Sequence, residues 1–250
     1  MFKPDKICQF VLYMLLLQRI YILYQYHSEM LVILDFDGTI ADTQSLIVKT
    51  MQQTMKELGM EVMPRENCAK TIGLRLEEGF QLLYKIPYDE AVRCAATYRK
   101  IFEENKKKMV VEPFPHVIET IKQMMKDKHV VAIASSRSRA SLLEYVKQMH
   151  IENCISCIVA ANDVEKVKPA PEMVLKVMKE VNGNPEDTIV VGDMTYDIEM
   201  GKNAGTKTCG VTYGNGTPEQ LLAADYVIDD FAELIALINN DKHLSDRFSR

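Results

Sequence analysis

The stretch LVILDFDGTIAD, residues 31–42, constrains the fold of this chain more than any other. Four apolar residues, 31–34, are typical of a short strand buried on both faces, and the strand would end at two acids, Asp35 and Asp37. Gly38 allows the chain to turn sharply after them, because glycine adopts backbone angles that other residues avoid. Two carboxylates this close raise each other's pKa unless a cation lies near them. The stretch therefore predicts a polar site that needs a positive partner.

Further apolar runs also end in polar residues. The runs 130–134 and 188–192 have the length and composition of buried strands, and amphipathic helical stretches separate them. This alternation predicts a doubly wound α/β fold, in which the carboxyl ends of parallel strands meet at one edge. The polar residues at those ends and in the loops between them are Ser135, Ser136, Lys168, Asp193 and Asp197. The periodicity alone thus indicates one pocket that combines carboxylates, hydroxyls and an ammonium.

Four short motifs resemble, in order, those of the haloacid dehalogenase superfamily. They are DFDGT at 35–39, AIASS at 132–136, KPAPE at 168–172 and GDMTYD at 192–197. The similarity is greatest to the helical-cap phosphatases of the phosphoglycolate phosphatase type, and it covers about 30–238. It implies a Rossmann-like core with an inserted helical cap.

The resemblance also implies roles for the acids. Asp35 would be the nucleophile that forms an aspartyl-phosphate, and Asp37 the general acid and base. Mg²⁺ prefers hard oxygen ligands, and those implied are Asp35, the Asp37 carbonyl and Asp193. Asp197 would orient a water on the metal rather than bind the metal directly.

The remaining implied site residues contact phosphate or substrate. Lys168 would neutralise the nucleophile and a phosphoryl oxygen, and Ser135 would donate a hydrogen bond to the phosphate. Ser136 and Thr39 are further phosphate-binding candidates, although each is also typical of an ordinary loop or cap. Arg75, in a loop similar to one that faces the active site in such phosphatases, would select a substrate carboxylate or would simply start a helix.

The domain organisation follows from the change of pattern after Asp42. Residues 43–112 read as successive helices without a strand, and the Pro-Phe-Pro segment 113–115 marks their exit. The segment that leaves these helices would act as one of two hinges between them and the core. Position 116 is His where similar proteins often carry Gly, so the geometry of this hinge is not predicted. The predicted division is an apolar extension (1–29), a catalytic core (30–42 and 113–240), a helical cap (43–112) and a polar tail (241–250).

The apolar extension, 1–29, has three interpretations, ranked here in order. Met30 directly precedes the first strand. The first interpretation is therefore that the natural start is Met30 and that residues 1–29 are an upstream extension added by choosing the wrong start codon. A helix lying on a membrane surface comes second. A secretion signal comes third, because no small-residue cleavage site follows the apolar run.

The formal net charge of −5 excludes the basic footprint of a nucleic-acid-binding protein. The Cys154–Cys157 pair has no second pair to complete a zinc site, and packing is the favoured role for it. We therefore expect a cytoplasmic enzyme with a small phosphate ester as its partner. Its oligomeric state is not indicated.

Several functions share this core. The favoured one is a Mg²⁺-dependent monoester phosphatase, with 2-phosphoglycolate suggested by the resemblance. A sugar-phosphate mutase of the β-phosphoglucomutase type is the alternative, but Ile47 stands near the place of its cap histidine, and residues 73–76 differ from its cap loop. An inorganic pyrophosphatase or a broad-specificity phosphatase would keep every site residue. A non-catalytic regulator is disfavoured by the complete set of acids.

Overall fold

The computed structural model describes residue 14 and residues 29–239 of the 250-residue chain. The interpretations of the apolar extension and of the polar tail therefore lie outside the described residues, apart from positions 14 and 29. None of the helices in the described part combines the length and apolarity that a membrane span requires.

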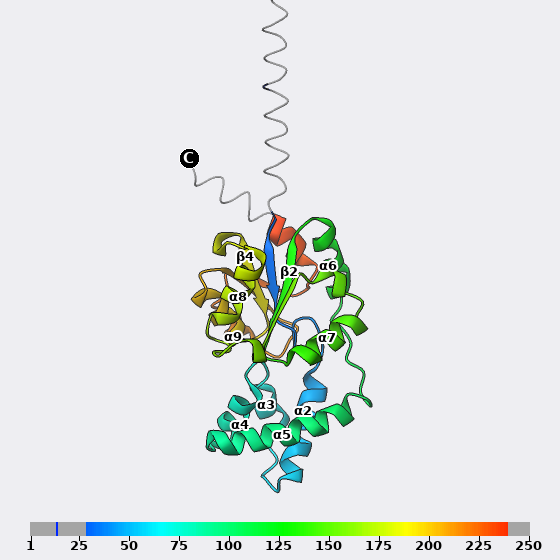
Figure 1. Ribbon diagram of the computed structural model, residues 1–250, viewed down its shortest axis with the longest axis vertical. Coiled ribbons are helices and arrows are strands. Elements are labelled where there is room, and N and C mark those ends of the chain that lie inside the picture. Colours follow the sequence, from blue (N-terminus) through cyan, green and yellow to red (C-terminus); the bar gives the residue numbers. More distant parts are fainter. Residues whose placement is uncertain (1–13, 15–28, 240–250) are drawn as a thin grey trace, which may run out of the picture.

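The core is one parallel sheet, as the alternation of helix and strand predicted. Its six strands stand in the order β3-β2-β1-β4-β5-β6, and every neighbouring pair is parallel. In Figure 1 the labelled strands β2 and β4 lie on either side of the blue β1. The predicted doubly wound α/β fold is confirmed. The strands are β1 (Leu31–Leu34), β2 (Val130–Ser135), β3 (Cys157–Ala160), β4 (Thr188–Gly192), β5 (Lys207–Val211) and β6 (Tyr226–Ile228).

Helices cover both faces of this sheet, because successive strand residues point to opposite sides. In β1, Val32 and Leu34 pack on one face, and Leu31 and Ile33 on the other. The first face is covered by α6 (Val117–Lys126) and α7 (Arg139–Gln148), and the second by α8 (Glu172–Val181) and α9 (Thr195–Asn203) (Figure 1). Burial on both faces explains why these strands read as unbroken apolar runs. The short elements of the core are η1 (Glu152–Cys154), η2 (Ala161–Asp163), η3 (Pro185–Asp187) and α10 (Pro218–Leu221).

Four helices between β1 and α6 form a separate body, which we call the helical cap. They are α2 (Gln44–Glu57), α3 (Arg65–Ala69), α4 (Leu76–Tyr84) and α5 (Tyr88–Asn105), and they lie beyond the carboxyl edge of the sheet (Figure 1). The helical cap has its own apolar core, in which Met55 and Phe80 are fully buried.

The two chain segments that join the helical cap to the core run side by side. The backbone N–H of Asp42 donates to the carbonyl of Glu112 at 3.0 Å, and that of Phe114 donates to Ile40 at 3.0 Å. His116, the residue that precedes α6, adopts a left-handed backbone with φ of 61°, which glycine adopts without strain. Its Nδ1 lies 2.7 Å from a carboxylate oxygen of Asp230, so a side-chain contact holds the strained residue in place.

Candidate active site

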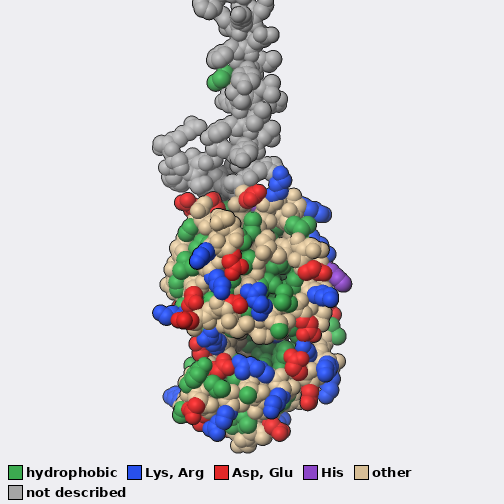
Figure 2. All heavy atoms as spheres, in the orientation of Figure 1, with side chains coloured by type: hydrophobic (Ala, Val, Ile, Leu, Met, Phe, Trp, Pro, Cys, Tyr) green, Lys and Arg blue, Asp and Glu red, His purple; other side chains and the backbone are tan. Residues whose placement is uncertain are grey.

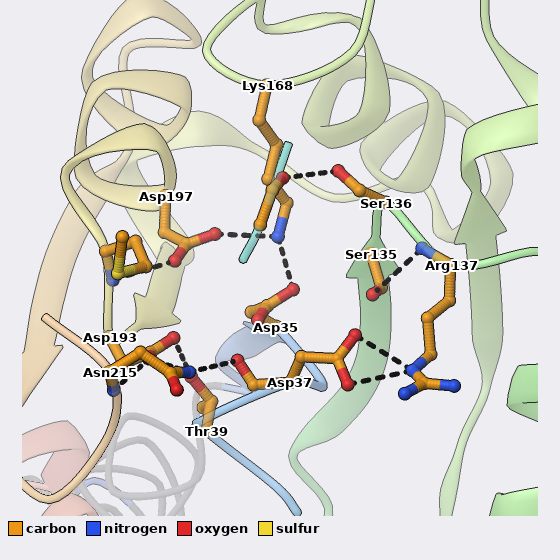
Figure 3. Close-up of polar contacts among 12 residues, drawn as sticks. Asp35, Asp37, Thr39, Ser135, Ser136, Arg137, Lys168, Asp193, Asp197 and Asn215 are labelled. Carbon is orange, nitrogen blue, oxygen red and sulfur yellow. Dashed lines mark hydrogen bonds and ion pairs between the residues drawn. The ribbon is translucent and has the colours of Figure 1, made fainter. Parts of the chain in front are cut away.

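The polar residues that follow three neighbouring strands come together at the carboxyl edge of the sheet. Asp35 follows β1, Ser135 ends β2 and Asp193 follows β4, and the register places Leu34 beside Ile133 and Val191. The backbone N–H of Asp35 donates to the carbonyl of Val191 at 2.9 Å, which fixes the position of the Asp35 backbone at the end of β1. Figure 3 shows Asp35, Ser135 and Asp193 gathered at this edge of the sheet.

Lys168 lies between two of the acids. Its Nζ donates to Oδ1 of Asp35 and, at 2.6 Å, to Oδ1 of Asp197 (Figure 3). The lysine side chain is fully buried and the two carboxylates nearly so. A buried ammonium is stable only when carboxylates compensate its charge, so this contact fixes Lys168 against Asp35.

The electrostatics of the group follow from burial and from the excess of acids. Burial raises the pKa of Asp35 to about 7; Lys168 opposes this rise, and Asp197 and Asp37 add to it. Burial and the charges of Asp197 and Asp35 raise the pKa of Asp193, although the N–H groups of Asn215 act against the rise. The cluster thus holds more negative charge than its lysine neutralises.

A cation would find ligands among these acids. Carboxylate oxygens of Asp35, Asp193 and Asp197 lie within 4.8 Å of one another. Oδ2 of Asp35 is buried and has no hydrogen-bond partner among the described residues, whereas both oxygens of Asp197 are engaged, by Lys168 and by the N–H of Met194. A buried acceptor without a donor is costly, and a hard divalent cation would satisfy it.

Thr39 lies against Asp193 and is not exposed to solvent. It is fully buried, and its Oγ1 is 3.4 Å from Oδ1 of Asp193. The structure thus gives this sequence-predicted phosphate-binding candidate a carboxylate partner.

Asn215 is a site residue that the sequence did not reveal. Its backbone N–H and its Nδ2 donate to Oδ2 of Asp193 at 2.6 and 2.8 Å, and Nδ2 is 3.4 Å from the carbonyl oxygen of Asp37 (Figure 3). The flanking glycines allow this approach, because a Cβ at Gly214 would come within 2.3 Å of Asp193 and one at Gly216 within 2.0 Å. A Gly-Asn-Gly turn after a strand was the available signal, and it looks like any other turn in the sequence.

Asp37 is turned away from Lys168, toward a second missed residue, Arg137. Nε of Arg137 lies 2.8 Å from both carboxylate oxygens of Asp37, and Thr43 donates to Oδ1 at 2.6 Å (Figure 3). Asp37 follows β1 and Arg137 follows β2, so the pair joins two neighbouring strand ends.

Aromatic rings surround the guanidinium of Arg137. Its central carbon lies 5.6, 5.2 and 5.1 Å from the ring centroids of Phe36, Phe102 and Tyr145. Phe102 belongs to α5 of the helical cap, and the other two rings belong to the core. Cation–π contacts of this kind are strongest where water is excluded, so Arg137 ties Asp37 to the position of the helical cap.

The two serines of β2 and its end have different partners. Ser135 is buried, and its Oγ accepts a 3.4 Å hydrogen bond from the N–H of Arg137. Ser136 donates from Oγ to the carbonyl of Gly73 in the helical cap at 2.6 Å. The hydroxyl of Ser136 is therefore used to join the two bodies, where the sequence suggested a phosphate contact.

Arg75 also joins the helical cap to the core. Its guanidinium donates to the backbone carbonyls of Ala161 and Val164 at 2.7 Å and to that of Glu165 at 3.1 Å. Val164 and Glu165 belong to the loop between η2 and α8 that also carries Lys168, and Ala161 lies just before it. The sequence suggested a substrate-carboxylate role for Arg75, and in the structure backbone acceptors of the core occupy its donors instead.

A cavity of about 450 Å³ lies between the helical cap and the core. Asp37, Ser135 and Arg137 line it from the core, and α2, α4 and α5 supply residues on the opposite side. Figure 2 shows that the surface is hollowed where the two bodies meet. A pocket of this size above the strand ends is typical of a small-molecule site.

Known proteins share this sequence pattern. The model of the haloacid dehalogenase-like hydrolase family matches residues 32–211. The chain is 30% identical over 210 residues to a protein named pyrophosphatase PpaX from Bacillus mycoides (strain KBAB4), which covers 83% of this chain and 96% of the relative. It is 34% identical over 215 residues to a protein named "Probable phosphatase IndB" from Dickeya dadantii (strain 3937), with 82% of this chain and 91% of the relative covered.

A solved structure shows the same fold. A protein described as a predicted phosphatase from Clostridium acetobutylicum superposes with a TM-score of 0.78 over 85% of this chain and 100% of that chain, at 21% identity. The match to the family model spans every acid of the site, from Asp35 to Asp197, and ends before Asn215.

Proposed function

The chain belongs to the haloacid dehalogenase-like hydrolase family, and we propose that it is a Mg²⁺-dependent phosphatase that uses Asp35 as its nucleophile. The names of relatives, phosphatase and pyrophosphatase, support hydrolysis of a phosphoric ester or anhydride as the reaction class. The substrate proposed on this basis is a phosphate monoester.

The observation that carries the proposal is the environment of the Asp35 carboxylate. One oxygen is held by Lys168, and the other is buried with no partner among the described residues. The contact with Lys168 holds the Asp35 carboxylate in a defined orientation, which favours attack on phosphorus. Lys168 compensates negative charge on the nucleophile and would do the same for a phosphoryl oxygen beside it.

The acids of the site fit a divalent cation. Asp35, Asp193 and the carbonyl oxygen of Asp37 would hold Mg²⁺, and Asn215 and Lys168 would orient the carboxylates around it. When bound, the ion supplies positive charge that stabilises the charge of the transferring phosphoryl group. Three buried carboxylates against one ammonium leave a negative excess that a divalent ion would balance.

The chain's own residues account for the proton transfers. Asp35 attacks phosphorus, the P–O bond to the alcohol breaks, and Asp37 gives the departing oxygen its proton. Asp37, now a carboxylate, then takes a proton from the water that attacks the aspartyl-phosphate, which releases phosphate and restores Asp35. Arg137 and Thr43 hold the Asp37 carboxylate beside the cavity where the alcohol would lie.

A pyrophosphatase is the second candidate, favoured by the 30% identity to PpaX over most of both chains. The mutase alternative needs a proton-transferring residue from the helical cap. Ile47, which lines the cavity from α2, has no proton to transfer. Phosphoglycolate, expected from the resemblance, remains a candidate substrate to be measured.

The test is phosphate release and trapping of the covalent intermediate. Full-length protein with Mg²⁺ should release phosphate from monoesters, and chelation by EDTA or Asp35→Asn should abolish release. After rapid acid quenching, peptide mapping should place the phosphoryl group on the peptide that contains Asp35. Turnover by a correctly folded Asp35→Asn variant, or phosphorylation at another residue, would disprove the nucleophile assignment.

A further inference from the structure

The cavity between the helical cap and the core lies on the side of the leaving group. Asp37, the proposed acid that protonates the departing alcohol, lines its core end together with Ser135. The part of the substrate that departs must therefore occupy this space, if the phosphatase function proposed above holds. Its volume of about 450 Å³ is within the range of sites that enclose drug-sized molecules.

The cap side of the cavity carries an apolar patch beside Arg75, Glu77, Arg99 and Glu103. Ile47 and Met51 come from α2, Leu76 from α4, and Tyr98 and Phe102 from α5. The rings of Tyr98 and Phe102 stack with centroids 5.7 Å apart, and both residues are more than nine-tenths buried. An apolar ligand would remove these side chains from water, which is favourable, whereas they offer a charged ligand no compensating partner.

The charged side chains that line the cavity all have partners within the protein. Arg137 is paired with Asp37, Arg99 with Glu77 at 2.6 Å, and Glu103 with Lys106 at 2.8 Å.

Arg75, the remaining charged residue of the lining, donates to three backbone carbonyls of the core. A second anionic group on the substrate would have to share a guanidinium that already serves one of these partners, or stay uncompensated. Either arrangement stabilises the group less than an unpaired cation would.

We propose that the preferred substrate is the phosphate monoester of an uncharged alcohol with a sizeable apolar body, alkyl or aryl, rather than a small ester that carries a second anionic group. The two-carbon leaving group of phosphoglycolate would leave most of the cavity to water. The second phosphate of pyrophosphate would face apolar side chains, and the arginines that line the cavity are already paired with groups of the protein.

The first experiment is a series of alkyl phosphates with full-length protein and Mg²⁺. Ethyl, butyl and hexyl phosphate have leaving groups of similar acidity, so differences in kcat/KM report contacts of the alkyl chain. A fully buried methylene raises binding about fourfold. We expect kcat/KM for hexyl phosphate to exceed that for ethyl phosphate at least ~10-fold.

Charge is tested with an isosteric pair. Isobutyl phosphate and 2-phosphoglycolate have leaving groups of the same branched shape, and only the second carries a carboxylate. We expect isobutyl phosphate to be hydrolysed with the higher kcat/KM. Ile47→Arg, which adds an uncompensated cation to the apolar patch, should shift the ratio toward 2-phosphoglycolate at least ~10-fold. Ile47→Gln, with similar bulk and no charge, should leave the order unchanged.

The outcomes separate this inference from the phosphatase assignment. Turnover with a flat alkyl series, or with 2-phosphoglycolate or pyrophosphate preferred, overturns the inference and leaves the phosphatase intact. If no ester is hydrolysed, calorimetric titration with alkylphosphonates decides. Hexylphosphonate binding at least ~10-fold more tightly than ethylphosphonate would retain the apolar pocket without the activity, and equal or absent binding would overturn both.

Discussion

Arg137 binds Asp37 through Nε, which lies 2.8 Å from each carboxylate oxygen, and the two residues are 100 positions apart in the sequence. The guanidinium also contacts the ring of Phe102 in the helical cap. The proposed acid–base residue is thus held by an arginine whose own position depends on the helical cap. This relationship, with four others, leads to direct tests.

Replacing Arg137 should lower kcat even though the residues that contact phosphate are left in place. We expect Arg137→Ala to reduce kcat about 10²-fold, because the acid–base carboxylate loses its orientation. Arg137→Lys keeps the charge without the planar fork and should recover part of the loss. Steady-state kinetics with thermal denaturation of both variants is the measurement; equal kcat in Arg137→Ala and the wild type would remove Arg137 from this role.

The metal-free protein should lose stability as the pH rises. Burial raises the pKa of folded Asp35 to about 7, against about 3.9 in an unfolded chain, so the folded state binds the additional proton between these values. The contribution to the free energy of unfolding is full below about pH 4 and falls as the pH rises through about 7. The raised pKa of Asp193 acts in the same direction.

Thermal denaturation with EDTA from pH 5 to 8 measures this effect. Asp35→Asn should flatten the decline in Tm, because the amide does not titrate, and Mg²⁺ should restore stability at the upper end. The same slope in Asp35→Asn and in the wild type would show that another group is responsible.

Lys168 should be needed for both activity and folding. Lys168→Met leaves the carboxylates of Asp35 and Asp197 buried without their cation, so the free energy of unfolding should fall by about 3–5 kcal/mol without metal. Activity should fall at least ~10²-fold. Adding Asp197→Asn should recover stability but not activity. Lys166→Met, at an exposed lysine two residues earlier, is the matched control and should behave as wild type.

Asn215 should control metal affinity. Asn215→Ala removes the Nδ2 contacts to Asp193 and to the carbonyl of Asp37, both proposed ligands. Loss of a residue that orients ligands typically weakens metal binding 10–100-fold, so the Mg²⁺ concentration for half-maximal activity should rise by about that factor. Asn184→Ala, at an exposed asparagine, should leave it unchanged. An unaltered Mg²⁺ dependence in Asn215→Ala would contradict this role.

Arg75 should hold the helical cap against the core. Arg75→Ala removes the hydrogen bonds to Ala161, Val164 and Glu165, and we expect faster hydrogen exchange in residues 161–165 with about a 10-fold lower kcat/KM. Arg93→Ala, at an exposed arginine of α5, is the control. If Arg75→Ala instead lost activity only toward substrates with a carboxylate, Arg75 would be a specificity residue, as the sequence first suggested.

The sequence by itself determined the parallel α/β core and the acids at its edge. Asp35, Asp193 and Asp197 directly follow or closely follow apolar runs, and Lys168 lies in a recognisable loop, so local pattern was sufficient. Strands buried on both faces leave a strong signal, and parallel strands bring their carboxyl ends to one edge whatever the details of the loops.

Tertiary structure alone decided which side chains complete the site. Arg137 reaches Asp37 from the end of the neighbouring strand, and Arg75 reaches a carbonyl 89 residues away. In the sequence, Arg137 is only an arginine after a pair of serines, and Arg75 only an arginine before a helix. Asn215 acts because Gly214 and Gly216 allow its turn to lie against Asp193. Such contacts depend on how the helical cap and the loops pack against the sheet. Packing between distant segments leaves no periodic trace in the residues that take part.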